Sequence, residues 1–121
     1  MKNSHNIYLI SDSTGETLDR IFLALKAQFE NFEYQISQFS FTRTETQIKK
    51  IIENAEQEKN PIILYTIVNS KLAKYLTDES RKKKIPCFGV LGELILNFSK
   101  ILNQKASHEP SGQHALNKEY Y

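Results

Sequence analysis

The sequence has 121 residues and a net charge of +2, with 40% hydrophobic and 25% charged residues. This length suits one domain, and so small a charge gives no reason to expect a nucleic-acid partner. No apolar run approaches the ~20 residues that a membrane-spanning helix requires. Cys87 is the only cysteine, which excludes a disulfide framework and a cysteine-based metal site. We therefore expect a cytoplasmic protein that binds neither a membrane nor nucleic acid.

The start of the chain predicts a strand, a tight turn and a helix in close succession. Asn6–Ser11 is an apolar run typical of a strand that is buried on both faces of a parallel sheet. The small and polar stretch Asp12–Thr17 follows it. An amphipathic helix comes next, and its apolar stripe is Leu18, Ile21, Phe22, Leu25 and Phe29.

The next unit predicts an edge strand and a well-capped helix. Tyr34–Phe41 has an apolar alternation that Gln38 interrupts, which is typical of a half-exposed strand. Thr44–Gln47 has the Thr-x-x-Gln pattern of a capping box. The helix behind it has the inward residues Ile48, Ile51, Ile52 and Ala55, and Pro61 prevents its continuation.

The remaining apolar segments predict two more strands, each followed by a helix. Ile62–Val68 is the most β-prone stretch, and the third helix turns Leu72, Ala73 and Leu76 inward. The basic run Arg81–Lys84 at the end of this helix suits the helix dipole, with an anionic partner as the alternative. Pro86 opens the short strand Cys87–Leu91. The fourth helix carries Leu94, Ile95, Phe98, Ile101 and Leu102.

This alternation predicts an α/β fold, a small doubly wound parallel sheet of about four strands in the order 2-1-3-4, flanked by helices. Residues 1–102 would form the α/β domain. Residues 103–121 lack apolar periodicity and would form an irregular, extended C-terminal arm.

Ligands of such sheets bind at the carboxyl ends of the strands, beside the point where the strand order reverses. The loops Ser11–Thr17 and Thr66–Ser70 would meet there, and the first of them opens a helix, whose N-terminus favours anions. The candidate anion- or nucleotide-binding residues are Ser11, Asp12, Ser13, Thr14, Gly15, Thr17, Thr66 and Asn69.

These loops also have a purely structural interpretation. Ser13 or Thr14 could simply cap the first helix, and Asn69 or Ser70 the third. With its single glycine, the first loop matches neither the Walker A pattern nor Gly-x-Gly-x-x-Gly. The local chemistry leaves both interpretations open.

Other reactive residues give no catalytic or metal site. Asp12 could accept a phosphoryl group or hold Mg²⁺, but Glu16 is the only carboxylate near it in sequence. His108 and His114 lie in the irregular arm without the partners that zinc requires. Cys87 is expected to pack in the core.

Four stretches together resemble one protein family. They are Ser11–Thr17 (Ser-Asp-Ser-Thr-Gly-Glu-Thr), Leu64–Asn69, Ile85–Cys87 with Leu91, and Gln113–Leu116 with Glu119 and Tyr120. In order and spacing they are similar to the N-terminal half of the pyruvate, phosphate dikinase regulatory proteins, which include the phosphoenolpyruvate synthase regulators. The resemblance covers essentially the whole chain, and Ser11–Thr17 is its specific part.

The resemblance implies a bifunctional, cytoplasmic Ser/Thr kinase and phosphorylase. Such an enzyme uses ADP to phosphorylate a threonine of pyruvate, phosphate dikinase or phosphoenolpyruvate synthase, and inorganic phosphate to remove that group as diphosphate. The family's nucleotide loop is a Gly-rich, Lys-Thr-containing segment of a second half, and nothing in this sequence matches it. The resemblance assigns no catalytic residue to this chain.

The resemblance also implies that the chain is truncated, as a gene fragment or as half of a split enzyme, and inactive alone. The missing C-terminal half would then be a partner. Two residues depart from the family pattern: Ser111 stands where glycine is usual, and Asn117 where aspartate is usual. Two alternatives remain, a non-catalytic fragment that binds the target enzyme and a stand-alone, flavodoxin-like binder of anions or nucleotides.

Overall fold

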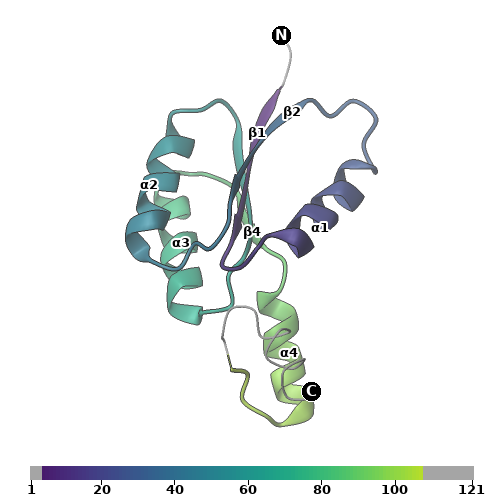
Figure 1. Ribbon diagram of the computed structural model, residues 1–121, viewed down its shortest axis with the longest axis vertical. Helices are drawn as coiled ribbons and strands as arrows, with labels where there is room; N and C mark the ends of the chain where they lie inside the picture. Colours follow the sequence, from purple (N-terminus) through teal and green to yellow (C-terminus); the bar gives the residue numbers. More distant parts are fainter. Residues whose placement is uncertain (1–3, 108–121) are drawn as a thin grey trace.

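The strand β1 (His5–Ser11) lies at the centre of the computed structural model, which describes residues 4–107. It pairs in parallel with β2 (Tyr34–Phe39) on one side and with β3 (Pro61–Thr66) on the other. The short strand β4 (Cys87–Gly89) extends the sheet beyond β3. The resulting order β2-β1-β3-β4 confirms the predicted α/β fold and its strand order. Figure 1 shows this sheet between its helices.

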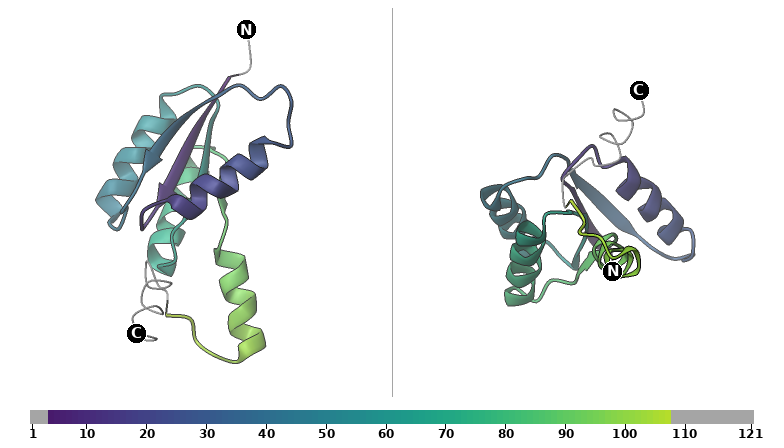
Figure 2. Two further views of the ribbon diagram at one scale, coloured as in Figure 1. Left: turned by 45° about the vertical axis from the view of Figure 1, so that its right-hand side comes forward. Right: turned by 90° about the horizontal axis from the view of Figure 1, so that it is seen from below.

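Helices lie on both faces of this sheet. The helix α1 (Glu16–Lys26) covers one face, and α2 (Glu45–Glu56) and α3 (Ser70–Lys82) cover the other (Figure 2). Right-handed crossovers produce this division, because the chain moves one way across the sheet after β1 and the opposite way after β2 and β3.

Two hydrophobic clusters hold these layers together. The larger packs Ile48, Ile52 and Leu76 of the paired helices against Tyr8 and Ile10. The smaller packs the helix on the opposite face against the sheet, through Ile7, Leu9, Leu18, Phe22 and Leu64. Alternate residues of β1 thus enter opposite clusters, which explains why this strand is apolar throughout.

The capping box of α2 forms as the sequence predicted. The Thr44 hydroxyl accepts a hydrogen bond from the Gln47 N–H at 3.1 Å, and the Gln47 side-chain oxygen accepts one from the Thr44 N–H at 3.1 Å. Ile51 and Ala55 face the core as well. The helix start is therefore specified by local sequence alone.

Several elements are shorter than their apolar patterns suggest. β2 stops at Phe39 instead of Phe41, because Phe41 takes a left-handed conformation with φ of 54° that turns the chain. α1 stops at Lys26, before Phe29, whose N–H bonds to the Lys26 carbonyl in a tight turn. The last two strands end at Thr66 and Gly89, each two residues earlier than predicted.

The helix α4 (Gly92–Leu102) follows β4 and runs past the end of the sheet (Figure 1). It has the predicted amphipathic pattern, yet none of its residues is fully buried. Residues 103–107 contain no helix or strand, and the rest of the predicted arm lies outside the described residues. No helix within residues 4–107 is long and apolar enough to cross a membrane.

Candidate functional site

Three loops meet at the carboxyl ends of β1, β2 and β3. Ser11 at the end of β1 lies in register with Thr66 at the end of β3, so the two predicted loops start side by side. The third loop, residues 40–43, follows the edge strand on the other side of β1. We call the three together the loop cluster.

Asp12 joins two of these loops. Its side chain is buried, and its Oδ2 accepts a hydrogen bond from the Val68 N–H at 2.9 Å. Burial raises the pKa of Asp12, while the Val68 hydrogen bond and the positive charge of Arg43 act in the opposite direction. In this arrangement the carboxylate connects the loops after β1 and β3.

The loop at residues 40–43 covers the first loop from the other side. The N–H groups of Phe41 and Thr42 donate to the carbonyls of Ser13 and Ser11, each at 2.9 Å. Arg43 Nε donates to the Asp12 carbonyl at 2.8 Å, and its guanidinium lies 5.4 Å from the centre of the Phe41 ring. These bonds hold the backbone of the first loop in one conformation.

The third loop was not predicted from the sequence. The residue that could have indicated this loop is Arg43. It is a cation between the end of a predicted strand and a capping box, in a loop at the carboxyl edge of the sheet. The long-range hydrogen bonds that make it part of the cluster have no counterpart in the local sequence.

The start of α1 differs from the predicted capping. Gly15 is the N-cap, with φ of 91°, and no side chain caps the helix, so capping by Ser13 or Thr14 is wrong. The Ser11 hydroxyl accepts from the Ser13 N–H at 3.0 Å instead, and Thr14 Oγ1 lies 3.4 Å from the Glu16 nitrogen. The left-handed turn that Gly15 allows removes both hydroxyls from the capping position.

The two ends of the first loop differ in accessibility. Ser11 and Asp12 are buried beneath the turn, whereas Thr14 and Thr17 are exposed at the N-terminus of α1. The first-turn N–H groups of a helix lack intrahelical acceptors and carry a partial positive charge. Thr14 and Thr17 therefore present hydroxyls beside a weakly electropositive helix end.

The turn itself borders a very small cavity among the described residues. A space of about 10 Å³ lies between Ser11, Gly15 and Ser40, which is about the room that one water molecule needs. The Ser40 hydroxyl donates to the Thr14 carbonyl at 2.9 Å across this space. An anion at this edge would lie on the surface of the cluster, at the exposed hydroxyls.

The two predicted binding residues at the end of β3 and in the loop after it, Thr66 and Asn69, have different surroundings. Asn69 caps α3, because its Oδ1 accepts from the Leu72 N–H at 3.0 Å. Thr66 is buried in the sheet beside Ser11. The structure thus brings Thr66 to Ser11 and Asp12, while Asn69 is exposed and occupied by its helix.

Within residues 4–107, the other polar and reactive residues considered above have structural roles. Within residues 4–107 no group of three or more His, Cys, Asp or Glu residues could hold a metal ion. His108 and His114 lie outside the described residues. Cys87 packs against the larger hydrophobic cluster, and burial raises the pKa of its thiol. Arg81 and Lys82 form exposed ion pairs with Asp78 and Glu79 within α3.

Comparison with known proteins identifies one family. The model of a family described as Kinase/pyrophosphorylase matches residues 7–121. A protein of Pelagibacter ubique named "Putative pyruvate, phosphate dikinase regulatory protein" is 65% identical over 121 residues, which is all of this chain and 44% of that relative. Relatives with the same name from Brucella anthropi and Geotalea uraniireducens are 36% and 32% identical, over 96% and 95% of this chain and 42% of each relative. The chain thus spans less than half the length of these relatives.

Proposed function

Because the chain belongs to the kinase/pyrophosphorylase family, we propose that it forms the amino-terminal part of a regulatory enzyme acting on pyruvate, phosphate dikinase or phosphoenolpyruvate synthase. The observation that carries this proposal is the match over residues 7–121, which includes the whole loop cluster. The names of the relatives support pyruvate, phosphate dikinase as the target, and the sequence resemblance adds phosphoenolpyruvate synthase as the alternative.

The proposed reactions are two phosphoryl transfers at one threonine of the target. In the first, the threonine hydroxyl attacks the terminal phosphorus of ADP, AMP leaves, and the hydroxyl proton is lost. In the second, an oxygen of inorganic phosphate attacks the phosphothreonine phosphorus, the bond from phosphorus to the threonine oxygen breaks, and diphosphate forms as that oxygen takes up a proton. Catalysis of such transfers depends on positioning and on stabilising the charge of the transferred group.

Within this enzyme, the loop cluster would supply one wall of the site at which the phosphoryl group is transferred. Two features support this role: the exposed Thr14 and Thr17 hydroxyls at the start of α1, and the backbone bonds that hold them in place. Fixed donors of this kind lose little free energy to reorganisation when charge develops near them. The nucleotide itself would bind in the part of the family's polypeptide that this chain does not span.

The test uses a joined polypeptide, in which this chain is combined with the rest of the Pelagibacter ubique relative in its native order. We expect it to phosphorylate pyruvate, phosphate dikinase with ADP and to remove the group with inorganic phosphate. Thr17→Val should lower the rate roughly ten- to a hundredfold, as expected for one hydrogen bond to a charged group. The matched control is Thr46→Val, because Thr46 is also the exposed second residue of a helix.

The outcomes separate three hypotheses. Equal rates for the two variants would contradict a wall at the start of α1. Calorimetry of the 121-residue chain with ADP and with phosphate tests the hypothesis of a stand-alone binder. No heat with ADP and none with phosphate would exclude this hypothesis. If the joined polypeptide transfers no phosphoryl group but the 121-residue chain binds the target enzyme, the chain is a non-catalytic interaction module.

A further inference from the structure

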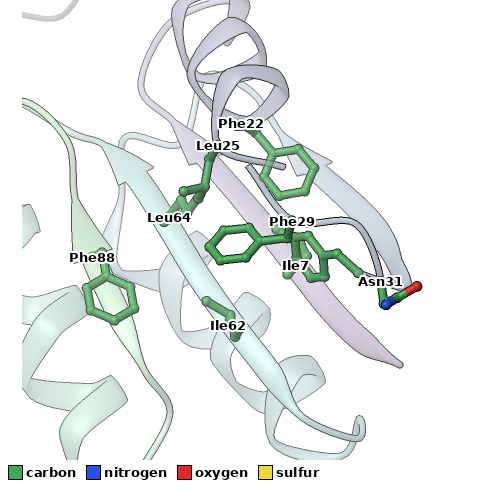
Figure 3. Close-up of a pocket in the computed structure, with 9 residues that line it drawn as sticks. Ile7, Phe22, Leu25, Phe29, Asn31, Ile62, Leu64 and Phe88 are labelled. Carbon is green, nitrogen blue, oxygen red and sulfur yellow. The ribbon is translucent and has the colours of Figure 1, made fainter. Parts of the chain in front are cut away.

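An apolar groove lies on the face of the sheet that carries α1, away from the loop cluster residues. It has a volume of about 360 Å³ and runs between α1 and β4 (Figure 3). Leu25 and Phe29 border it on one side and Phe88 on the other, and Ile62 and Leu64 form its floor. Asn31 is the one polar residue that lines it among the described residues.

The groove is the part of this face that no helix within residues 4–107 covers. Leu64 and Phe88 are neighbours in the register of β3 and β4 and lie on the same face. The opposite face of these two strands is covered by α3, which packs with Cys87 and Ile63 in the larger cluster. Parallel sheets are ordinarily covered on both faces. As far as the structure describes the chain, the second layer of the fold is therefore incomplete on this half of the face.

The aromatic residues at the rim of the groove are also poorly covered. Phe29 and Phe88 are each more than half exposed, although large aromatic side chains are usually buried. α4 does not fill the gap, because it extends beyond the sheet and its own apolar residues, such as Phe98 and Ile101, are exposed (Figure 2). A contiguous exposed apolar surface of this kind marks an interaction site.

We propose that the groove is the docking site for an apolar face of a helix from the part of the family's polypeptide that this chain does not span. Helices are the elements that cover parallel sheets, and the apolar lining requires an apolar partner. The source of this helix follows from length, because 56% of the Pelagibacter ubique relative lies outside the match that covers 44% of it. This inference rests on family membership and not on the proposed phosphoryl transfer.

Hydroxyl-radical footprinting tests the proposal, because the oxidation of phenylalanine reports the exposure of its ring. The 121-residue chain and the joined polypeptide are compared at equal radical dose, monitored with an added reporter peptide. We expect oxidation of Phe29 and Phe88 to fall at least about fivefold in the joined polypeptide, since a packed contact excludes water from both rings. Unchanged oxidation of the two rings would overturn the proposal.

Two other occupants give different results in the chain alone. Protection that appears only at high concentration of the 121-residue chain would identify a second copy as the occupant. Protection at every concentration would identify another segment of the same chain, such as α4, as the occupant. Either result overturns the proposal.

A matched pair of variants shows where the partner docks. Leu25 borders the groove and is 41% exposed, whereas Leu23 lies outside the groove lining on the same helix and is 56% exposed. Leu25→Asp should restore the oxidation of Phe88 in the joined polypeptide, and Leu23→Asp should not. Circular dichroism of the same variants in the 121-residue chain checks that both still fold. Equal behaviour of the two variants would overturn the proposal, and because no activity is measured, this test fails separately from the proposed function.

Discussion

The carboxylate of Asp12 and the N–H of Val68 form a 2.9 Å hydrogen bond between two loops that are 56 residues apart in the sequence. The bond lies at the reversal of strand order, where ligands of doubly wound sheets bind. Its donor belongs to the backbone, so it restrains the loop after β3 whatever side chain stands at that position. Asp12 thereby determines how the edge of the sheet that carries the exposed hydroxyls is assembled.

Asp12→Ala removes this acceptor and should lower the free energy of unfolding by about 1–3 kcal/mol, the usual cost of losing a buried hydrogen-bond partner. Asp12→Asn keeps an oxygen at the same position and should cost less. Urea denaturation of the three proteins measures both effects. Equal losses for Ala and Asn would mean that the bond to Val68 contributes little.

The same residue predicts a pH dependence of stability. Burial raises the pKa of Asp12 above its ordinary value of 3.8, so the folded protein keeps a proton that the unfolded chain has already released. The free energy of unfolding contributed by Asp12 therefore falls as pH rises from 3.8 through the raised pKa, and is constant above it. Asp12→Asn does not titrate, so its stability relative to the unsubstituted protein should increase with pH across this interval. Urea denaturation at a series of pH values checks the sign, and a relative stability that decreases with pH would contradict the expectation.

Gly15 is predicted to be required at the start of α1. Its φ of 91° is a conformation that residues with a Cβ adopt at a cost of roughly 1–2 kcal/mol. The surroundings would tolerate the extra atom, because an added Cβ would lie 3.5 Å from the Ser40 hydroxyl. Gly15→Ala should thus lower the free energy of unfolding through the backbone alone. Gly92→Ala is the control, since a Cβ there would meet nothing within 4 Å and should be neutral or slightly stabilising.

The capping box of α2 offers a local test. Thr44→Ala removes the acceptor for the Gln47 N–H and should lower the free energy of unfolding by about 1 kcal/mol. Thr46→Ala, on the exposed side of the same first turn, should change it by less than about 0.5 kcal/mol. Thermal denaturation followed by circular dichroism compares the two. A loss at Thr46 as large as that at Thr44 would contradict a specific contribution of the cap, because alanine has a higher helix propensity than threonine.

Two isoleucines of contrasting exposure allow the contributions of α2 and α4 to stability to be compared. Ile48 is 0% exposed and Ile101 is 76% exposed. Ile48→Ala should lower the free energy of unfolding by about 2–5 kcal/mol, and Ile101→Ala by less than about 0.5 kcal/mol. Denaturant titration of the 121-residue chain measures both. A substantial loss at Ile101 would show that α4 contributes to the core of the chain in solution.

The fold could be predicted from the sequence because the patterns that specify it are local. The uninterrupted apolar run before Ser11 predicts a central strand, and Gln38 in the following strand predicts an edge, which together give the strand order. The predicted ends of α1 and β2 were too late, because Phe29 and Phe41 continue an apolar pattern although the backbone has already turned. Periodicity reports which residues avoid water, and it does not report backbone conformation.

The candidate site shows where such reasoning stops. The sequence by itself determined the α/β class, the α2 cap, the position of the loops and, through Ser11–Thr17, the family resemblance. Only the tertiary structure decided that Gly15, and not Ser13 or Thr14, is the N-cap of α1, and that Asp12 bonds to Val68. It also decided that residues 40–43 complete the cluster and that, within residues 4–107, half of one sheet face is left uncovered. The reason is physical: the first group depends on neighbours within a few residues, whereas the second depends on groups that only folding brings within hydrogen-bond or van der Waals distance.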